Sequence, residues 1–244
     1  MKIIGLLQAR NEERFIKGWL ENIAPAVDGI VALDDGSTDE TWKIISAHEK
    51  TLDVIRRPVG KDWNEYINQV SLIQAGRRHR ADWFLCLDAD ERIEDRLSRD
   101  IRTLLVQADE RKVDALSLHL RDLWNDRFNY RVDGIWANRG RYSLFRNDNT
   151  HTKFDPRRLH RHWLPLEMVT DIKNIGVAIP YAIYHLRMIR LEDRIARYER
   201  YTKIDPNNRF QHQGYGHLID ENNLELASVP ADRDFSPKND PSIS

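Results

Sequence analysis

Two short apolar runs in the first half of the chain each lead directly into a cluster of carboxylates. The run at residues 30–33 continues into the acidic segment 34–39, and the run at 83–87 continues into 88–91. Continuous apolar runs of this length are typical of buried strands in a parallel sheet. Ligands of open α/β sheets bind beyond the carboxyl ends of such strands. The pattern therefore predicts two acidic clusters at one sheet edge, where a cation or a hydrogen-bonding ligand relieves their mutual repulsion.

Strand-like and helix-like segments alternate through the first 110 residues. Strands are predicted at residues 3–7, 30–33, 52–55 and 83–87. Helices are predicted after an N-cap at Asn11, after a capping box at residues 37–40, after a cap within residues 62–65, and around Leu97 to Leu105. This alternation predicts an α/β fold with a mostly parallel, twisted sheet that is flanked by helices on both faces.

The alternation ends after about residue 112. Further strands are predicted at residues 113–120, 142–145, 175–179 and 182–186, with polar loops between them and a helix around 191–198. We therefore divide the chain into an α/β half at residues 1–110, a second half of the same domain at 111–204 that extends the sheet, and a polar tail at 205–244. Because Pro, Asn, Asp and Ser dominate this tail, we expect it to be weakly ordered or to fold only against a ligand.

The composition narrows the possible classes of protein. The formal net charge of the 244 residues is -1, which argues against a nucleic-acid-binding protein. No Gly-x-Gly-x-x-Gly motif follows the first strand, which argues against a dehydrogenase. The single cysteine, Cys86, lies in a predicted buried strand. Because one cysteine cannot form a disulfide within the chain, we expect a reducing compartment. We expect a cytosolic protein without a signal sequence or membrane span, and we leave peripheral membrane contact open.

Asp88 and Asp90 flank the small Ala89 at the end of the last apolar run. Residues two apart on an extended chain point to the same side, roughly 6–7 Å apart. Magnesium typically binds one or two carboxylates together with substrate phosphates. The spacing thus indicates a metal ion that holds a diphosphate, although a plain acidic turn between a strand and a helix has the same sequence.

Asp34 and Asp35 come before the turn that opens the next helix. Helix capping explains Ser37 and the acidic residues that follow it, because they favour the positive end of the helix dipole. It does not explain Asp34 and Asp35. A carboxylate at this place can accept a hydrogen bond from an N–H of uracil or guanine, as Asp does from other base edges.

Three segments in this order resemble the family 2 nucleotide-sugar glycosyltransferases with the GT-A fold. They are Ala9-Arg10-Asn11-Glu12, the segment 34–41 and the segment 88–91. Within the family, the chain most resembles the branch that adds sugars to lipopolysaccharide cores. The features that indicate this branch are Glu91, the segment 141–146 and Tyr184-His185-Leu186. The resemblance implies a Rossmann-like sandwich, in which residues 1–110 bind a nucleotide sugar and residues 111–204 form a smaller extension that binds the acceptor.

The resemblance also implies the roles of individual residues toward the donor. Ala9, Arg10 and Asn11 would line the pocket for the base and ribose, and Asp34 and Asp35 would hold the base. Asp88, beside Ala89, would bind the ribose or the outer shell of the metal. Asp90 would bind Mn²⁺ or Mg²⁺ directly, with His185 completing the metal shell. Imidazole beside carboxylate favours manganese, and a UDP-sugar is favoured over a GDP-sugar as donor.

The implied reaction inverts the anomeric carbon of the sugar as a hydroxyl of a glycan or lipid-linked acceptor attacks it. In place of the acidic base that related enzymes often carry, this chain has His160 and His162, whose ordinary pKa suits proton removal. Carboxylates nearby are alternatives for the base. They are Asp155, Glu167 and Asp171. The neighbouring Arg157, Arg158 and Arg161 are alternatively interpreted as a site for an acidic acceptor.

Two other functions remain open at this point. A nucleotidyltransferase or a sugar-nucleotide phosphohydrolase would use a similar sheet and metal, but residues 7–10 lack the Gly-rich loop of many nucleotidyltransferases. A glycan- or nucleotide-binding module without catalysis would keep the sheet and lack the base. The sequence does not predict the oligomeric state.

Overall fold

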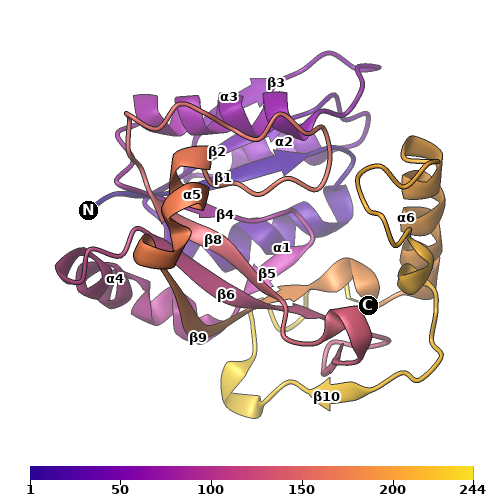
Figure 1. The fold of residues 1–244 in the computed structure, drawn as a ribbon. Coiled ribbons are helices and arrows are strands. Elements are labelled where there is room, and N and C mark those ends of the chain that lie inside the picture. Colours follow the sequence, from indigo (N-terminus) through magenta and orange to yellow (C-terminus); the bar gives the residue numbers. More distant parts are fainter. Residues whose placement is uncertain (244) are drawn as a thin grey trace.

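The computed structural model describes residues 1–243, and its main feature is one eight-stranded sheet (Figure 1). Its strands are β1 (Ile3–Ala9), β2 (Gly29–Asp34), β3 (Thr51–Arg56), β4 (Trp83–Cys86), β5 (Glu91–Ile93), β6 (Ala115–Asp122), β8 (Gly140–Arg146) and β9 (Gly176–His185). They lie in the order β3-β2-β1-β4-β8-β6-β9-β5. The strands β1 to β4 are parallel, as are β6 and β9, whereas β8 and β5 pair antiparallel with their neighbours.

Six α-helices accompany the sheet within the described residues. They are α1 (Glu13–Ile23), α2 (Thr41–Ala47), α3 (Glu65–Arg78), α4 (Asp95–Glu110), α5 (Leu166–Ile175) and α6 (Leu191–Ile204). Apolar residues of α1, α2 and α4 pack on one face of the sheet, and those of α3 and α5 pack on the other. The predicted α/β fold, with a mostly parallel sheet flanked by helices, is confirmed.

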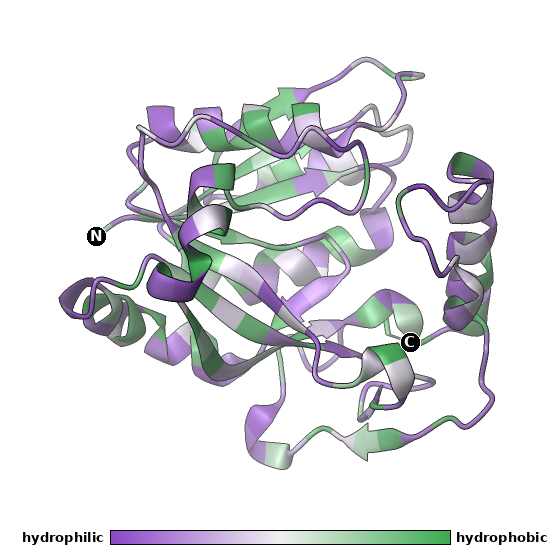
Figure 2. Ribbon diagram, in the orientation of Figure 1, coloured by the Kyte–Doolittle hydropathy of each residue, from purple (hydrophilic) through white to green (hydrophobic). Residues whose placement is uncertain are grey.

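Burial on both faces explains why the first strands are apolar throughout. In β1, Ile3 and Leu7 face the core under α1, whereas Ile4 and Leu6 face the core under α3. Successive residues of a strand point to opposite faces, so a strand covered on both sides needs apolar residues at every position. Figure 2 shows the same central strands as predominantly hydrophobic ribbons inside more polar helices.

Two of the predicted helix caps are wrong, and the same polar residues join two loops instead. The helix α1 begins after Glu12, and Asn11 adopts a left-handed conformation with a φ of 56°. Its Oδ1 accepts a hydrogen bond from the Thr38 N–H at 2.8 Å. Ser37 does not cap α2, because its Oγ accepts from the Asn11 N–H at 2.9 Å. The loops after β1 and β2 are therefore fixed to each other. The cap at Asn64 is confirmed.

The second half departs from the prediction in detail. The two strands predicted at 175–179 and 182–186 are one strand, β9, which contains Pro180. The pairing of β6 with β9 shifts between Ser117 and His119, and this irregularity accommodates a residue that has no N–H to donate. The helix α5 occupies a stretch expected to be a polar loop, and the three-residue strand β5 was not predicted. A small second sheet pairs β7 (Asn129–Arg131) with β10 (Leu226–Ser228).

The tail was expected to be weakly ordered, but residues 205–243 pack against the rest of the chain. Phe235 is fully buried beside Tyr184. Asp240 forms a buried ion pair with Arg92 at 2.8 Å. The carboxylate of Asp205 accepts hydrogen bonds from three backbone N–H groups of the loop that follows it. The polar residues that suggested disorder are thus used in buried contacts. Within residues 1–243, no helix is long and apolar enough to cross a bilayer.

Candidate functional site

The carboxyl ends of β1, β2 and β4 meet beside a cavity of about 210 Å³. Arg10, which directly follows β1, lines this cavity, as do Asp88, Ala89 and Asp90, which follow β4. The Asp35 N–H donates to the carbonyl of Ala9 at 2.8 Å, which extends the pairing of β1 and β2 to the cavity edge. The two acidic clusters predicted at one sheet edge therefore lie at the same edge.

Asp35 lies directly behind Arg10 rather than on the cavity wall. Its carboxylate is fully buried and forms ion pairs with Arg10 and Arg57, each at 2.8 Å. Burial raises the pKa of Asp35, and the two guanidinium groups oppose that rise. The Arg10 guanidinium also lies 5.6 Å from the ring centre of Trp63, which lines the same cavity. Asp35 thus fixes the Arg10 guanidinium, which lies beside the ring of Trp63 in the cavity.

Asp34 and Asn11 hold the turn instead of lining the cavity. The fully buried Asp34 accepts a hydrogen bond from the Ser37 N–H at 3.3 Å, and Arg56 lies 3.6 Å from its second oxygen. Gly36, between Asp34 and Ser37, has a φ of 78°, a backbone conformation that is strained for residues with a side chain. A Cβ at Gly36 would also lie 2.8 Å from the carbonyl oxygen of Pro58.

Asp90 is the electrostatic centre of the site. Its Oδ2 accepts from Arg187 at 2.5 Å and lies 3.2 Å from Nε2 of His185. Arg197 approaches the same oxygen at 3.9 Å. Burial opposes ionisation, but Arg187 and His185 hold the pKa of Asp90 well below its usual range. Asp88, in contrast, is 45% exposed in its side chain, and its nearest cation is Arg141 at 3.6 Å.

His185 is fixed from behind by a carboxylate that the sequence did not single out. Its Nδ1 lies 2.7 Å from Oδ1 of Asp122, and the two residues are register partners at the ends of β6 and β9. Burial lowers the pKa of His185, but Asp90 and Asp122 together raise it to about 9. The available signal was the position of Asp122 at the end of a predicted strand.

The pair of Asp90 and His185 fits a divalent cation. A carboxylate behind the imidazole of a ligand histidine fixes the ring and its tautomer, which is the role that Asp122 fills. Asp90 and His185 would hold the metal ion in competition with Arg187, which donates to Oδ2 of Asp90, and with Arg197, whose Nη1 lies 2.9 Å from Nε2 of His185. Within residues 1–243, no three His, Cys, Asp or Glu side chains form a metal-binding group. The protein would therefore supply two ligands, and donor phosphates and water the others.

Several cavity residues come from parts of the sequence that carried no motif. Arg187 belongs to the turn η3 (Leu186–Met188), and Arg197, Arg200 and Tyr201 project from α6. The spacing of Arg197 and Tyr201 places them on one face of a helix, which is the only signal in the sequence. Glu65, at the start of α3, also lines the cavity.

His160 and His162 lie in different surroundings. His160 lines a second cavity, of about 230 Å³, together with His185. Its Nε2 lies 3.2 Å from the hydroxyl of Tyr215, which itself donates to Asp205 at 2.9 Å. Because the hydroxyl has one proton, Nε2 of His160 must carry the hydrogen, and Nδ1 keeps the lone pair. Burial, followed by Arg197, lowers the pKa of His160, so the ring is neutral at neutral pH.

His162 and the carboxylates considered as alternative bases line neither cavity. Nδ1 of His162 lies 3.0 Å from the carbonyl oxygen of Leu164. Asp155 pairs with Arg157, Glu167 accepts from backbone N–H groups, and Asp171 bonds Asn174.

Arg157, Arg158 and Arg161, which the sequence offers as a site for an acidic acceptor, are also absent from both cavity walls. Arg157 pairs with Asp155, and Arg158 and Arg161 donate to backbone carbonyls of residues 63, 65 and 66.

Known proteins share both the sequence pattern and the fold. The model of glycosyl transferase family 2 matches residues 7–194. Uncharacterized proteins of Mycobacterium tuberculosis and Mycobacterium bovis are each 28% identical over 218 residues. These alignments cover 86% of this chain and 52% of each relative, so the chain spans about half the length of the curated relatives it matches.

Two solved structures show the shared architecture. S. aureus TarS 1–349 in complex with UDP-GlcNAc is 15% identical with a TM-score of 0.52, covering 91% of this chain and 71% of that chain. The mannosyltransferase PcManGT from Pyrobaculum calidifontis, in complex with GDP-Man and Mn²⁺, is 12% identical with a TM-score of 0.52, covering 89% and 72%. The expected GT-A architecture is thereby confirmed.

Proposed function

The chain belongs to glycosyl transferase family 2, and from this we propose that it transfers a sugar from a nucleoside diphosphate donor to an acceptor hydroxyl. One observation carries the proposal: Arg10, Asp88 and Asp90 line one cavity, and Asp35 lies directly behind Arg10. The relatives support it, because TarS binds UDP-GlcNAc and PcManGT binds GDP-Man.

The donor is proposed to lie along this cavity with its base at one end and its diphosphate at the other. Arg10 and Trp63 offer a cation and an aromatic face to the base and ribose, with Ala9, Asn11, Asp34 and Asp35 forming the support behind them. Asp88, beside Ala89, lies where a ribose hydroxyl can be bound. At the other end, Arg187 and Arg200 offer positive charge to the diphosphate. A UDP-sugar is the first choice of donor, and a GDP-sugar the second.

The proposed metal ligands are Asp90 and His185, with Asp88 in the outer shell. When bound, Mn²⁺ or Mg²⁺ would neutralise the charge that develops on the departing nucleoside diphosphate. Imidazole beside carboxylate favours manganese, which PcManGT also binds. The guanidinium of Arg187 supplies further positive charge at the same place.

His160 is the proposed general base. Its free Nδ1 belongs to a ring that is neutral at neutral pH and is held by the chain of hydrogen bonds through Tyr215 to Asp205. A base in the second cavity, which meets the first at Arg197 and Tyr201, can take the proton from an acceptor hydroxyl there. Attack from that side in one displacement inverts the anomeric carbon.

The finer family position is also a proposal. Glu91 and Arg141, two features of the branch that acts on lipopolysaccharide cores, form an ion pair behind Asp88. Register pairing of Glu91 with His185 joins the third feature to them. With this branch we propose a glycan or lipid-linked acceptor, a role in polysaccharide biosynthesis and a cytosolic location, and we leave peripheral membrane contact open.

Release of nucleoside diphosphate from a panel of nucleotide sugars tests the proposed function. We expect release to require Mn²⁺ or Mg²⁺ and to fall by about 100-fold or more in Asp90→Asn, because the metal loses its carboxylate. Asp232→Asn, on the exposed turn η5 (Ala231–Arg233), is the matched control and should keep full activity. Turnover at the wild-type level in Asp90→Asn would count against the metal site, and binding of nucleotide sugars without any turnover would leave only a binding module.

A further inference from the structure

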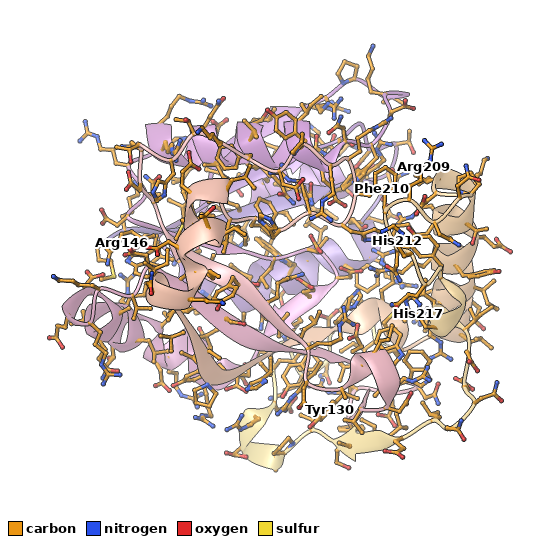
Figure 3. The ribbon with its side chains drawn as sticks, in the orientation of Figure 1. Tyr130, Arg146, Arg209, Phe210, His212 and His217 are labelled. Atoms are coloured by element: carbon orange, nitrogen blue, oxygen red, sulfur yellow. The ribbon has the colours of Figure 1, made fainter. Side chains whose placement is uncertain are left out.

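Residues from several distant parts of the chain line the second cavity, of about 230 Å³. Asp122 and His185 lie at strand ends, Trp136 and Arg139 lie in and after the turn η2 (Gly134–Trp136), and residues 211–218 follow α6. Figure 3 labels His217 of that last segment, which lies beside α6. Since Asp90 lines the first cavity and its contact His185 lines the second, the two cavities meet at the proposed metal site.

The walls of this cavity combine aromatic faces with hydrogen-bonding groups. Trp136, Tyr201 and Tyr215 supply the aromatic faces, and Tyr201 and Tyr215 stack with ring centres 5.1 Å apart. Gln213 is exposed at the cavity, beside Gln211. A few placed polar groups among aromatic side chains are typical of sites for small organic ligands, and the flat faces suit a sugar ring.

The charge of the cavity is positive. Arg139 and Arg197 bring two permanent charges, whereas Asp122 is the single carboxylate on the wall and is already paired with His185 and Arg139. Nε of Arg197 is buried and has no hydrogen-bond partner among residues 1–243. A buried donor without a partner is unfavourable, so a ligand that accepts from it gains affinity.

The surroundings of His217 agree with this field. Burial, followed by Arg139 and Arg197, lowers the pKa of His217 to about 4, so the ring is neutral at neutral pH. A cation in the cavity would meet the same repulsion as this imidazolium, whereas an anion would be attracted.

We propose that the second cavity binds the acceptor as a sugar ring bearing an anionic substituent, carboxylate or phosphate, which Arg139 and Arg197 hold while His160 faces the reactive hydroxyl. This inference rests on the proposed function and adds the chemical class of the acceptor. It places the anion among Arg139 and Arg197, which line this cavity, and not among Arg157, Arg158 and Arg161, which line neither cavity.

Direct binding of simple sugars by NMR titration tests the inference without any turnover. The probes are glucuronic acid, glucose 6-phosphate and neutral glucose, each added to the full chain with saturating UDP and Mn²⁺. We expect at least one anionic probe to bind about tenfold more tightly than glucose, because charge pairs with partly buried arginines are retained in water. Tighter binding of glucuronic acid or of glucose 6-phosphate identifies the anion as carboxylate or phosphate.

Three variants locate the binding site. Arg139→Met should weaken binding of the anionic probe by about tenfold, because it removes one of the two positive charges. Gln213→Glu should weaken it as well by repulsion, and it leaves the ion pair of Arg139 with Asp122 intact should Arg139→Met fail to fold. Arg157→Met, a charge-matched change outside both cavities, should bind as the wild type does.

The outcomes separate the inference from the proposed function. The inference is overturned if glucose and both anionic sugars bind equally, or if neither anionic sugar binds at millimolar concentration. It is also overturned if UDP competes with the anionic sugar, or if Arg157→Met loses binding and Gln213→Glu does not. The proposed function is tested apart from it, by nucleotide-sugar turnover: a protein that turns over donors but ignores anionic sugars refutes only the acceptor class.

Discussion

The two histidines of this site are each held by a partner on the side away from the proposed ligand. Asp122 holds His185, and Tyr215 holds His160 with Nδ1 free. The sequence predicted that His185 and the acidic motif belong together, and the two residues Asp90 and His185 do touch. It could not predict Tyr215 as a partner of His160, because the two lie 55 positions apart and the segment between them carries no pattern that brings them together.

The proposed general base His160 predicts the pH profile of the reaction. Because the pKa of His160 lies below the ordinary 6.5, its base form predominates at neutral pH. We therefore expect kcat/KM to fall only at acidic pH, as His160 becomes protonated. His160→Gln should lower kcat/KM at pH 7 by about 100-fold or more and abolish this acid limb. The measurement is kcat/KM for a nucleotide sugar from pH 5 to 9.

His162→Gln is the matched control, since His162 lines neither cavity. It should keep both the rate and the acid limb. If His162→Gln loses the acid limb and His160→Gln keeps it, the assignment of the general base to His160 is wrong.

Among the elements, the strands and helices of the first half were predictable and the loops were not. Apolar runs covered on both faces define β1, β2 and β4 unambiguously. The caps predicted at Asn11 and Ser37 do not form, because each side chain bonds the other loop, 26 or more positions away, and not its own helix. The short strand β5 and the Pro-containing β9 lack a length or periodicity that separates them from loops.

The tail is joined to the acidic loop through one buried arginine. Arg92 pairs with Asp240 and donates to the carbonyls of Ala89 and Glu91, at 3.0 and 2.9 Å. The helix α1 approaches this ion pair at Gly18. A Cβ there would lie 2.2 Å from Oδ2 of Asp240 and 2.7 Å from Nη2 of Arg92. The tail therefore supports the segment that carries Asp88 and Asp90.

Gly18→Ala should destabilise the fold by about 2 kcal/mol, because a methyl group in this space forces the ion pair apart. The free energy of unfolding is measured by urea denaturation with linear extrapolation. Gly216→Ala is the control, since nothing lies within 4 Å of its added Cβ, and it should change stability by less than about 0.5 kcal/mol. An equal, small effect of both substitutions would contradict the packing described for α1.

For the whole molecule, one sheet positions both the cavity proposed for the donor and the cavity proposed for the acceptor. The strands β1, β2 and β4 position the first cavity, and the ends of β6 and β9 position the wall shared with the second. The loop that contains Arg161 closes over α3, where its N–H donates to Glu65 at 3.2 Å. Burial, followed by the charge of Asp88, raises the pKa of Glu65 to about 7.

This shifted glutamate makes the stability of the fold depend on pH. Since its folded-state pKa of about 7 lies above the ordinary 4.5, its contribution to stability is complete below pH 4.5 and is lost as the pH rises through about 7. Glu65→Gln should remove this loss, so its stability relative to the wild type should rise by about 2 kcal/mol between pH 4.5 and 7.5. Chemical denaturation at both pH values measures it, and the exposed Glu49→Gln should show no such rise. A constant difference for Glu65→Gln would contradict the shift.

A crystal structure of the protein with UDP and Mn²⁺ is the most direct test of the claim that Asp35 and Asp90 serve one donor. We predict the diphosphate and metal at Asp90 and His185, and the uracil beside Arg10 and Trp63, within the cavity of about 210 Å³. A nucleotide bound elsewhere, or bound with Asp35 and Asp90 facing separate clefts, would contradict the claim.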